Sequence, residues 1–592
     1  MSLKPFVIWA PIPSAVTLMI KKVGGEEPSA VPMERDEEGW WHPAGPLPDA
    51  GAGDFDYGYR LDDGDTVLPD PRSLRQPDGV HGWSRTYDPT AYAWTDQMWN
   101  GRQLAGGIIY ELHIGTFTPE GTFAAAATRL QHLVDLGIDF VELMPVNDFN
   151  GEHNWGYDGV LWYAVHEAYG GPQGYQEFVD ACHAVGLGVI QDVVYNHLGP
   201  SGNYLPLFAP YLNEGGANTW GQSPNLDGED SDEVRRYIID NALLFLTEYH
   251  VDGLRLDAVH ALHDTRATHL LEEMAVDVDA RSAFLGRPLP LVAESDLNDP
   301  RLIAPRPAGG YGLDGQWSDD FHHALYVSLT GDTSGYYADF DSLDALAKVF
   351  ENGFFHDGTK SSFRGRSHGH PIDTHRTQTW RLVVCSDNHD QIGNRAAGER
   401  LSTKISKQQQ AIAAMVTLLS PFTPMIFMGE EWGASTPWPF FSSHPEPELA
   451  TAVRAGRLEE FAAMDWDTDA VTDPQDPQTF LDAKLDWSEV EKDEHAELLA
   501  ITTELLRIRR TYPDFTDPRF DQGRATSDDE AGWLLVERGD MVVAVNFHDH
   551  PTEVGFVPAL ASVFEIGDVT LGHGEIRLGP HSALAAEIIQ LD

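Results

Sequence analysis

The chain has 592 residues, and its 93 acidic and 39 basic side chains give a formal net charge of −54. Hydrophobic residues make up 42% and aromatic residues 10% of the sequence, which is typical of a folded globular protein and excludes a disordered acidic tail. The charge argues against nucleic acid or an anionic membrane as partner, because both are bound by clustered Lys and Arg side chains. The composition therefore favours a neutral ligand, and the length favours several domains.

Cysteine usage argues against a disulfide framework and against a thiolate zinc site. The two cysteines, Cys182 and Cys385, lie far apart and belong to no C-x-x-C motif. No stretch reaches the roughly 18 apolar residues that a membrane-spanning helix needs. We therefore expect no zinc site of this kind and no membrane-spanning segment. We also expect no other metal, no cofactor and no membrane partner.

The N-terminal segment resembles a signal peptide only superficially. Pro11 and Pro13 interrupt its apolar run, and no small-residue cleavage site follows. We predict two short strands around a turn, Phe6–Ala10 and Ala15–Ile20, and a cytoplasmic protein.

Both ends of the chain carry the pattern of antiparallel strands. Residues 1–97 are rich in Gly, Pro, Trp and Asp and contain short alternating runs such as Val16–Ile20, which predicts an N-terminal β-sandwich module of the immunoglobulin-like type. Alternation returns after about Pro513, as in Trp533–Glu537. This predicts a small C-terminal β-domain over residues 514–592.

From Gly107 onward, short apolar runs alternate with longer segments of helical period, which is typical of parallel strands buried on both faces. Eight such runs predict an α/β fold, a (β/α)₈ TIM barrel over residues 98–513 with an inserted lobe at residues 198–230. A doubly wound sheet is the alternative, but no G-x-G-x-x-G follows the first run. The predicted barrel strands are Ile108–Ile114, Phe140–Val146, Leu187–Val194, Gly253–Asp257, Leu291–Glu294, Gly315–Trp317, Leu382–Cys385 and Met425–Met428.

Ionisable and aromatic residues follow nearly every apolar run. In a barrel the carboxyl ends of the strands converge on one face, where barrel enzymes place their active sites. Each group alone has a structural explanation: Arg255 and Asp257, for example, could form an ion pair, because residues two apart on a strand share a face. Such groups on successive strands favour catalysis.

Four of these strand ends resemble the conserved regions of the α-amylase family of glycoside hydrolases: Asp192–His197, Gly253–His260, Ala293–Ser295 and Asp387–Asp390. The resemblance covers most of the chain, because Phe6–Leu18 is similar to the N-terminal module of that family. Within the family, further segments resemble the hydrolases that release trehalose from maltooligosyltrehalose. These segments are His153–Val160, Ser231–Asn241, His250–His260, Asp387–Arg395, Met428–Ser435 and Asp473–Phe480.

The resemblance implies a retaining mechanism in which two carboxyl groups flank the scissile bond. It assigns Asp257 as the nucleophile, Glu294 as the proton donor and Asp390 as the carboxylate that stabilises the oxocarbenium-like transition state. Arg255 would keep the nucleophile ionised, whereas Glu294 would need a raised pKa. The implied reaction is hydrolysis of the α-1,4 bond next to the terminal trehalose, which gives trehalose and a shortened maltooligosaccharide.

The same resemblance assigns residues to substrate binding. Tyr157 would stack on the sugar ring beside the cleaved bond with Trp155 behind it, and a core position is the alternative for Trp155. Hydrogen bonds to sugar hydroxyls or to the carboxylates are expected from His197, His260 and His389, and Asp158 is also expected to bind substrate. Candidates for the trehalose side are Trp220, Phe321, His322, Tyr336, Phe363 and Arg364.

Two other interpretations stay open. A glycogen branching enzyme uses the same carboxylates and a similar N-terminal module, and the motifs do not decide whether water or a glucan hydroxyl takes up the glucosyl intermediate. A non-catalytic barrel is expected to lack the nucleophile or the acid, and both are present.

Asn196 stands where amylases offer a calcium ligand, but we identify no partner oxygens for it in residues 198–230. The expected partners are maltooligosyltrehalose and maltooligosaccharides, and the oligomeric state is open.

Overall fold

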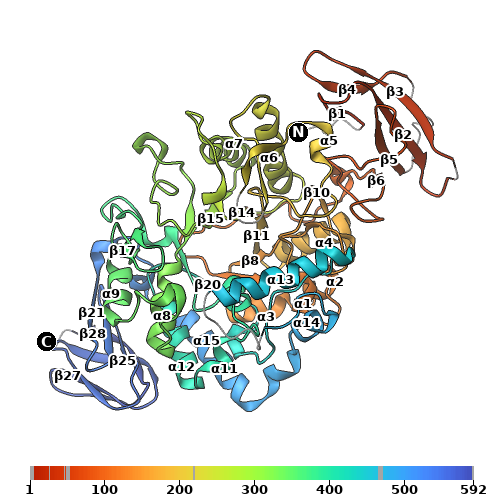
Figure 1. Cartoon of the computed structure of the whole chain (residues 1–592). Helices are drawn as coiled ribbons and strands as arrows, with labels where there is room; N and C mark the ends of the chain where they lie inside the picture. The colour runs from red at the N-terminus through yellow and green to blue at the C-terminus, as the bar shows by residue number, and fades with distance from the viewer. Residues whose placement is uncertain are drawn as a thin grey trace.

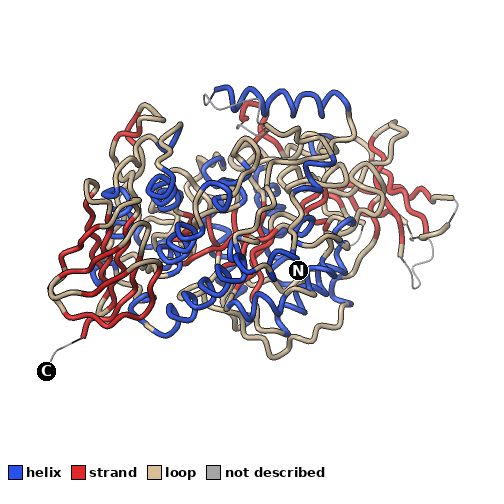
Figure 2. The backbone as a smooth tube through the Cα atoms, turned by 90° about the horizontal axis from the view of Figure 1, so that it is seen from below, coloured by secondary structure: helices blue, strands red, loops and turns tan. Residues whose placement is uncertain are grey.

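The computed structural model has a central barrel with antiparallel sheets at two ends of the molecule, the N-terminal sheet at the upper right and the C-terminal sheets at the lower left of Figure 1. Helices surround the barrel between these sheets (Figure 2). The structure describes residues 6–25, 27–45, 47, 54–217, 221–463 and 471–589.

The barrel is closed by eight parallel strands, in the circular order β7-β8-β11-β14-β15-β16-β19-β20. Each predicted apolar run overlaps one of these strands, so the barrel prediction is confirmed and the doubly wound sheet is excluded. The strands are β7 (Ile109–Leu112), β8 (Phe140–Leu143), β11 (Gly188–Val193), β14 (Gly253–Leu256), β15 (Leu291–Ala293), β16 (Gly315–Trp317), β19 (Leu382–Val384) and β20 (Thr423–Phe427).

Two layers of side chains fill the barrel. An apolar cluster contains one residue from each of β7, β8 and β11, and a buried carboxyl follows two positions later on the same strand. Residues two apart on a strand share a face, so a layer of acidic groups lies above the apolar layer, toward the carboxyl ends of the strands. The pairs are Ile109 and Glu111, Phe140 and Glu142, and Ile190 and Asp192.

The N-terminal module is an antiparallel sheet in the order β1-β4-β3-β2-β5-β6. Its strand β3 pairs with β2 through residues 29–32 and with β4 through residues 33–35, so β3 joins two halves of the sheet. The segment that resembles a signal peptide forms β1 and β2, as predicted. The strands are β1 (Ile8–Trp9), β2 (Val16–Lys22), β3 (Ser29–Arg35), β4 (Trp40–Pro43), β5 (Phe55–Leu61) and β6 (Ser84–Arg85).

Residues 198–230 lie between β11 and α6 (Ser231–Thr247) of the barrel and contact the N-terminal module. They contain helix α5 (Leu205–Phe208) and a hairpin of β12 (Leu212–Ala217) and β13 (Gln222–Pro224). The Ile12 N–H donates to the Phe208 carbonyl at 3.2 Å, and the rings of Trp9 and Tyr211 meet edge to face at 5.3 Å. Another hairpin follows the second barrel strand; its strands are β9 (Asn147–Asp148) and β10 (Leu161–Val165).

The C-terminal part has a five-stranded sheet, β21-β22-β23-β28-β25, and a three-stranded sheet, β24-β27-β26. Residues from both sheets, such as Val542 and Ile576, share one apolar cluster, as expected for a packed pair of sheets. The strands are β21 (Gly523–Asp528), β22 (Trp533–Arg538), β23 (Met541–Asn546), β24 (Thr552–Gly555), β25 (Ala559–Ile566), β26 (Val569–Leu571), β27 (Glu575–Leu578) and β28 (Ala583–Ile589).

The helices lie mainly around and above the barrel (Figure 1). None of those in the described part of the chain has the length and apolar character that crossing a membrane requires. Besides α5 they are α1 (Ile114–Phe117), α2 (Phe123–Ala127), α3 (Leu130–Leu136), α4 (Gly171–Ala184), α6 (Ser231–Thr247), α7 (Leu270–Leu285), α8 (Asp319–Thr330), α9 (Leu343–Asn352), α10 (His389–Gly393), α11 (Leu401–Lys404), α12 (Lys407–Leu418), α13 (Pro447–Ala463), α14 (Pro477–Asp482) and α15 (Asp493–Thr511).

Candidate active site

A cleft of about 750 Å³ opens at the carboxyl ends of the barrel strands. Asp257 directly follows β14, Glu294 directly follows β15, and Asp390 lies in the first turn of α10, after β19. All three carboxyl groups line the cleft. Its volume lies within the roughly 300–1,000 Å³ that is common for small-molecule sites.

Arg255 connects the first two of these carboxyl groups. Its guanidinium is fully buried; Nη1 donates to Asp257 Oδ1 at 2.8 Å, and Nη2 lies 3.0 Å from Glu294 Oε2. Nη1 also donates to both carboxylate oxygens of Asp192, at 2.7 and 2.8 Å. One guanidinium therefore holds Asp257 and Glu294 side by side at the floor of the cleft.

The second oxygen of Asp257 is held by Asn196. The Asn196 amide donates to Asp257 Oδ2 at 2.7 Å and to its backbone carbonyl at 3.0 Å. The His197 ring lies 2.6 Å from Asn196 Oδ1 through Nδ1 and 3.0 Å from the Tyr157 carbonyl through Nε2. Both oxygens of the Asp257 carboxylate are thus fixed, and 12% of its side chain is exposed. The sequence suggested Asn196 only as a possible calcium ligand and gave no sign of this contact with Asp257.

Glu294 lies in an environment that favours its protonated form. Burial, followed by the negative charges of Asp257 and Asp390, raises its pKa well above the ordinary value, although Arg255 acts in the opposite direction. The Ala258 N–H donates to Glu294 Oε2 at 2.6 Å. Ala258 adopts the left-handed conformation, with φ of 39°, which is a strained backbone of the kind found at functional sites. The surroundings of Glu294 therefore favour the form that carries a proton to donate.

His389 lies under the cleft, beside Asp390. Although burial opposes it, the carboxylates of Glu111 and Asp390 raise the pKa of His389 to about 9, so the ring is cationic at neutral pH. The backbone N–H of His389 donates to Glu111 at 3.0 Å, the ring Nδ1 bonds to the same carboxylate, and Nε2 lies 3.5 Å from Asp390 Oδ1. The acidic layer of the barrel thus supports a cation below the cleft.

Tyr157 and Trp155 come from the loop between β9 and β10, and both line the cleft. The Tyr157 hydroxyl donates to Asp192 at 2.6 Å and accepts from His389 Nε2 at 2.8 Å, and its ring stacks on His389 with centroids 5.3 Å apart. Trp155 is only 4% exposed and stacks on Trp438 at 5.7 Å. The position of Tyr157 is therefore fixed, and Trp155 is largely a packing residue.

The wall on the Glu294 side contains Asp296, Tyr336, Phe363 and Arg364. Arg364 Nη2 donates to Asp296 Oδ2 at 2.6 Å. Against the effect of burial, the charges of His260 and Arg364 lower the pKa of Asp296, so it is an anion. The rings of Tyr336 and Phe363 meet edge to face at 6.0 Å. This wall therefore offers aromatic surface, a cation and an anion beside the proposed acid.

Two predicted substrate contacts are corrected. Phe321 is fully buried and packs on Phe350 at 5.7 Å, and His322 is 1% exposed with Nδ1 at 2.8 Å from the Ser386 carbonyl. Both belong to helix α8, which begins at Asp319 directly behind β16, so they pack beneath the cleft.

The remaining predictions are placed as follows. Asp158 and His197 line the cleft, and His260 lies 3.8 Å from Asp296 without being part of the lining. Trp220 falls outside the described residues. Sequence reasoning did not assign several residues that line the cleft: Asn154, Ala258, Asp296, Trp317, Asp319, His323, Asn388, Gln391, Asn394, Phe440, Val453 and Arg457. Of these, Asn154, Ala258, Asn388, Gln391 and Asn394 lie in segments that carry the family resemblance, and Asp296 and Asp319 are acids near strand ends.

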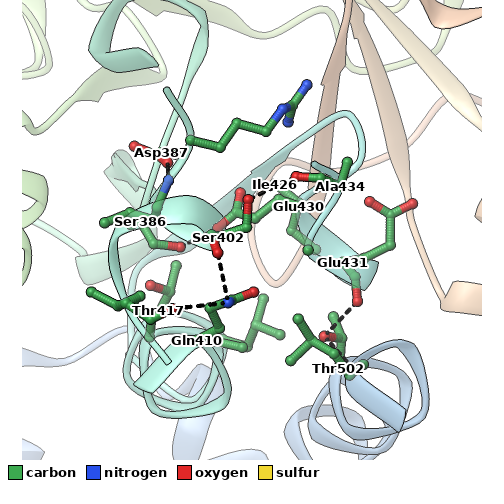
Figure 3. A pocket seen from close by; sticks show the side chains of 18 of the residues that line it. Ser386, Asp387, Ser402, Gln410, Thr417, Ile426, Glu430, Glu431, Ala434 and Thr502 are labelled. Carbon is green, nitrogen blue, oxygen red and sulfur yellow. Dashed lines mark hydrogen bonds between the residues drawn. The ribbon is translucent and has the colours of Figure 1, made fainter. Parts of the chain in front are cut away.

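A second, smaller cavity lies behind the end of β19 (Figure 3). Glu430 accepts hydrogen bonds there from the Ser386 hydroxyl and, at 3.0 Å, from the Phe427 N–H. Burial, with the added charge of Asp387, raises the pKa of Glu430 to about 8. The cavity measures about 40 Å³, enough for water but not for a sugar ring. We therefore interpret it as part of the packing around residues 386–390, which lead to Asp390.

No group of three or more His, Cys, Asp and Glu side chains is placed to hold a metal ion within the described ranges. The closed barrel, and a cleft in which a carboxyl group with a raised pKa adjoins two further carboxyl groups, define a glycoside hydrolase.

Comparison with known proteins agrees with this class. A family model described as "Alpha amylase, catalytic domain" matches residues 74–206, and one described as "Domain of unknown function (DUF3459)" matches residues 518–585. Malto-oligosyltrehalose trehalohydrolase from Rhizobium sp. (strain M-11) is 57% identical, over 98% of this chain and 96% of its own length. The chain therefore belongs to the malto-oligosyltrehalose trehalohydrolases, within the α-amylase type of glycoside hydrolase.

Two other similarities bear on the alternatives. The crystal structure of a putative α-amylase from Salmonella typhimurium superposes with a TM-score of 0.88 at 36% identity and covers 99% of both chains. A 1,4-α-glucan branching enzyme from Bacillus caldolyticus is 32% identical, but only over 53% of this chain and 50% of its own. The branching enzyme is thus a partial and more distant relative.

Proposed function

We propose that this enzyme hydrolyses the α-1,4-glucosidic bond next to the terminal trehalose of maltooligosyltrehalose, and that it does so with retention of configuration. The observation that carries the proposal is the placement of Asp257 and Glu294 on the single guanidinium of Arg255, with the pKa of Glu294 raised by its burial. A retaining glycosidase needs this combination, because a carboxylate nucleophile and a carboxylic acid must flank the same glycosidic bond. The names of the full-length relatives support the substrate.

In the first step, Glu294 donates its proton to the glycosidic oxygen as Asp257 attacks the anomeric carbon. The bond between that carbon and the leaving oxygen breaks, trehalose departs with the proton, and a glucosyl ester forms on Asp257. Asp390, the most exposed of the three side chains at 37%, faces the sugar and stabilises the positive charge that develops on its ring.

In the second step, the ionised Glu294 acts as a general base: it takes a proton from water while the water oxygen attacks the same carbon. The ester bond breaks, Asp257 leaves as a carboxylate, and Glu294 is protonated again. One water molecule is consumed per bond, and the shortened maltooligosaccharide is released with its original anomeric configuration.

The proposed binding roles follow from the two sides of the cleft. Tyr157 serves as the platform under the ring whose bond is cleaved, and Asp158, His197 and His389 hold that ring or the groups around it. The aromatic and charged wall next to Glu294 receives the trehalose, because the acid protonates the oxygen of the leaving group. That wall contains Asp296, Tyr336, Phe363 and Arg364, and we propose that Trp220 also contacts the trehalose.

A glycogen branching enzyme would use the same carboxylates and pass the glucosyl group to a glucan hydroxyl instead of water. The half-length match of the branching enzyme relative favours hydrolysis over this alternative. Product analysis on maltotriosyl trehalose separates the two: hydrolysis gives trehalose and maltotriose, whereas longer or branched glucans as main products would contradict the proposal. The cytoplasmic location expected from the sequence also stays a proposal, which cell fractionation would test.

A further inference from the structure

Helix α13 crosses the face of the barrel (Figure 1), and most of its side chains are exposed. Among the side chains described in its second half, those that are not exposed recur every four residues: Val453 and Arg457 are half-buried, and Phe461 is buried. Residues four apart lie on one face of a helix, so these three side chains form a single stripe toward the protein. Val453 and Arg457 line the cleft.

The side chain of Arg457 is held from several directions. Its Nη1 donates to Asn394 Oδ1 at 3.0 Å, and its Nη2 donates to the Gly393 carbonyl. The guanidinium lies 5.4 Å from the ring centre of Phe440 and 4.7 Å from that of Phe461. Arg457 is therefore pre-oriented at the cleft surface, which lowers the entropy that a ligand contact would cost.

The strand order shows which half of the cleft this helix covers. α13 follows β20, and the loop with Trp155 and Tyr157 follows β8. In the closed barrel, β7 stands between β20 and β8, and β15 stands opposite β7. Glu294 follows β15, so α13 lies across the cleft from the acid and from the proposed trehalose wall. The ring of Phe440 also contacts that of Trp155, edge to face at 5.2 Å.

We infer that Phe440, Val453 and Arg457 form the wall that binds the glucan chain upstream of the cleaved bond, and that Arg457 determines specificity for the length of that chain. The inference rests on the proposed function, because that function places trehalose on the opposite side. A planar guanidinium with several N–H donors suits the adjacent hydroxyls of glucose, and a phenyl ring suits the apolar face of a sugar. Both groups suit an uncharged ligand, which is the kind of ligand that the acidic composition favours.

The test compares Arg457→Ala with wild type on two substrates of different length. Glucosyl trehalose has one glucose upstream of the cleaved bond, which ends over Tyr157, whereas maltotriosyl trehalose has three. We expect kcat/KM for maltotriosyl trehalose to fall about tenfold, mainly through KM, and kcat/KM for glucosyl trehalose to stay within about twofold. Arg454→Ala is the matched control, because Arg454 lies on the same helix but pairs with Asp473 at 2.5 Å and does not line the cleft.

A second variant protects the test against a folding defect. Val453→Trp fills the wall without removing Arg457, and it should produce the same loss on the longer substrate alone. An equal loss on both substrates would mean that Arg457 only supports the segment next to Asp390, and an unchanged KM for the longer substrate would remove its binding role. Either result overturns the inference. Failure of the proposed function looks different, because the wild-type enzyme would then release no trehalose from either substrate.

Discussion

Replacement of Asn196 by aspartate tests the environment of the nucleophile most sharply. In the structure the Asn196 amide donates to Asp257 Oδ2 at 2.7 Å. Asn196→Asp keeps the shape of the side chain but puts a carboxylate in place of the donor. Two unit negative charges 2.7 Å apart repel each other by about 6 kcal/mol at an effective dielectric constant of about 20. Such a pair holds one proton between its two members until the pH is well above the usual carboxyl range.

The expected outcome is a large loss of activity at neutral pH and a shift of the acidic limb of kcat/KM to higher pH, because a shared proton blocks the nucleophile. Asn196→Ala removes the hydrogen bond without adding charge, so it should cost about 1.5–3 kcal/mol, or roughly 10- to 150-fold in kcat/KM. The acidic limb should also move to higher pH, but less than in Asn196→Asp. The assay is trehalose release from maltotriosyl trehalose between pH 4 and pH 10, with thermal unfolding as the folding control. An Asn196→Asp enzyme with the pH profile of wild type would refute the placement of Asn196 against the nucleophile.

Three further predictions concern protonation. Glu294→Gln should lower kcat about 10²- to 10⁴-fold and abolish the alkaline limb of activity. The raised pKa of Glu294 favours its protonated form, and activity is lost as the pH rises through that pKa. A residual activity with the wild-type alkaline limb would count against the acid role. Glu111→Gln should lower the pKa of His389 from about 9, so activity at pH 8 should drop and partly recover as the pH falls, which a pH profile or the histidine NMR signal would reveal. Glu430→Gln should stay active at pH 7, because the pKa of Glu430 is about 8 and the amide resembles the protonated acid. Folding raises that pKa, so the free energy of unfolding of wild type should fall between about pH 4.5 and pH 8. Thermal unfolding should show a shallower fall in the variant.

The barrel and its carboxyl groups were predictable because their signals are local in the sequence. A short apolar run marks a buried strand, and the residue after it marks the carboxyl end. Asp257 and Glu294 directly follow their strands, so predicting the strand also placed the side chain. Because the closed barrel places the carboxyl ends of all its strands on one face, both side chains were expected in one cleft.

The errors came from segments whose orientation depends on packing. The sequence predicts Phe321 and His322 as trehalose contacts, but α8 begins directly after β16 and places both side chains under the cleft. The next residue, His323, lines the cleft. Asn196 reaches Asp257 across 61 positions of sequence, and no spacing rule connects them.

The stripe of α13 shows the same limit. Val453, Arg457 and Phe461 recur at helical spacing, which indicates a one-sided helix, but the pattern does not say which surface the helix covers. Its position over the cleft is set by contacts such as that of Arg457 with Asn394, and these exist only in the folded chain.

A trapped intermediate gives the most direct test of the central claim, that Asp257 attacks the sugar while Glu294 carries the proton. The Glu294→Gln enzyme would be treated with an activated fluoroglucoside, whose leaving group needs no acid, and examined by mass spectrometry of the intact protein and of its peptides. The account predicts a single glucosyl ester on the peptide that contains Asp257, and none in the Asp257→Ala variant. An adduct on another residue, or no covalent species together with inverted product, would contradict it.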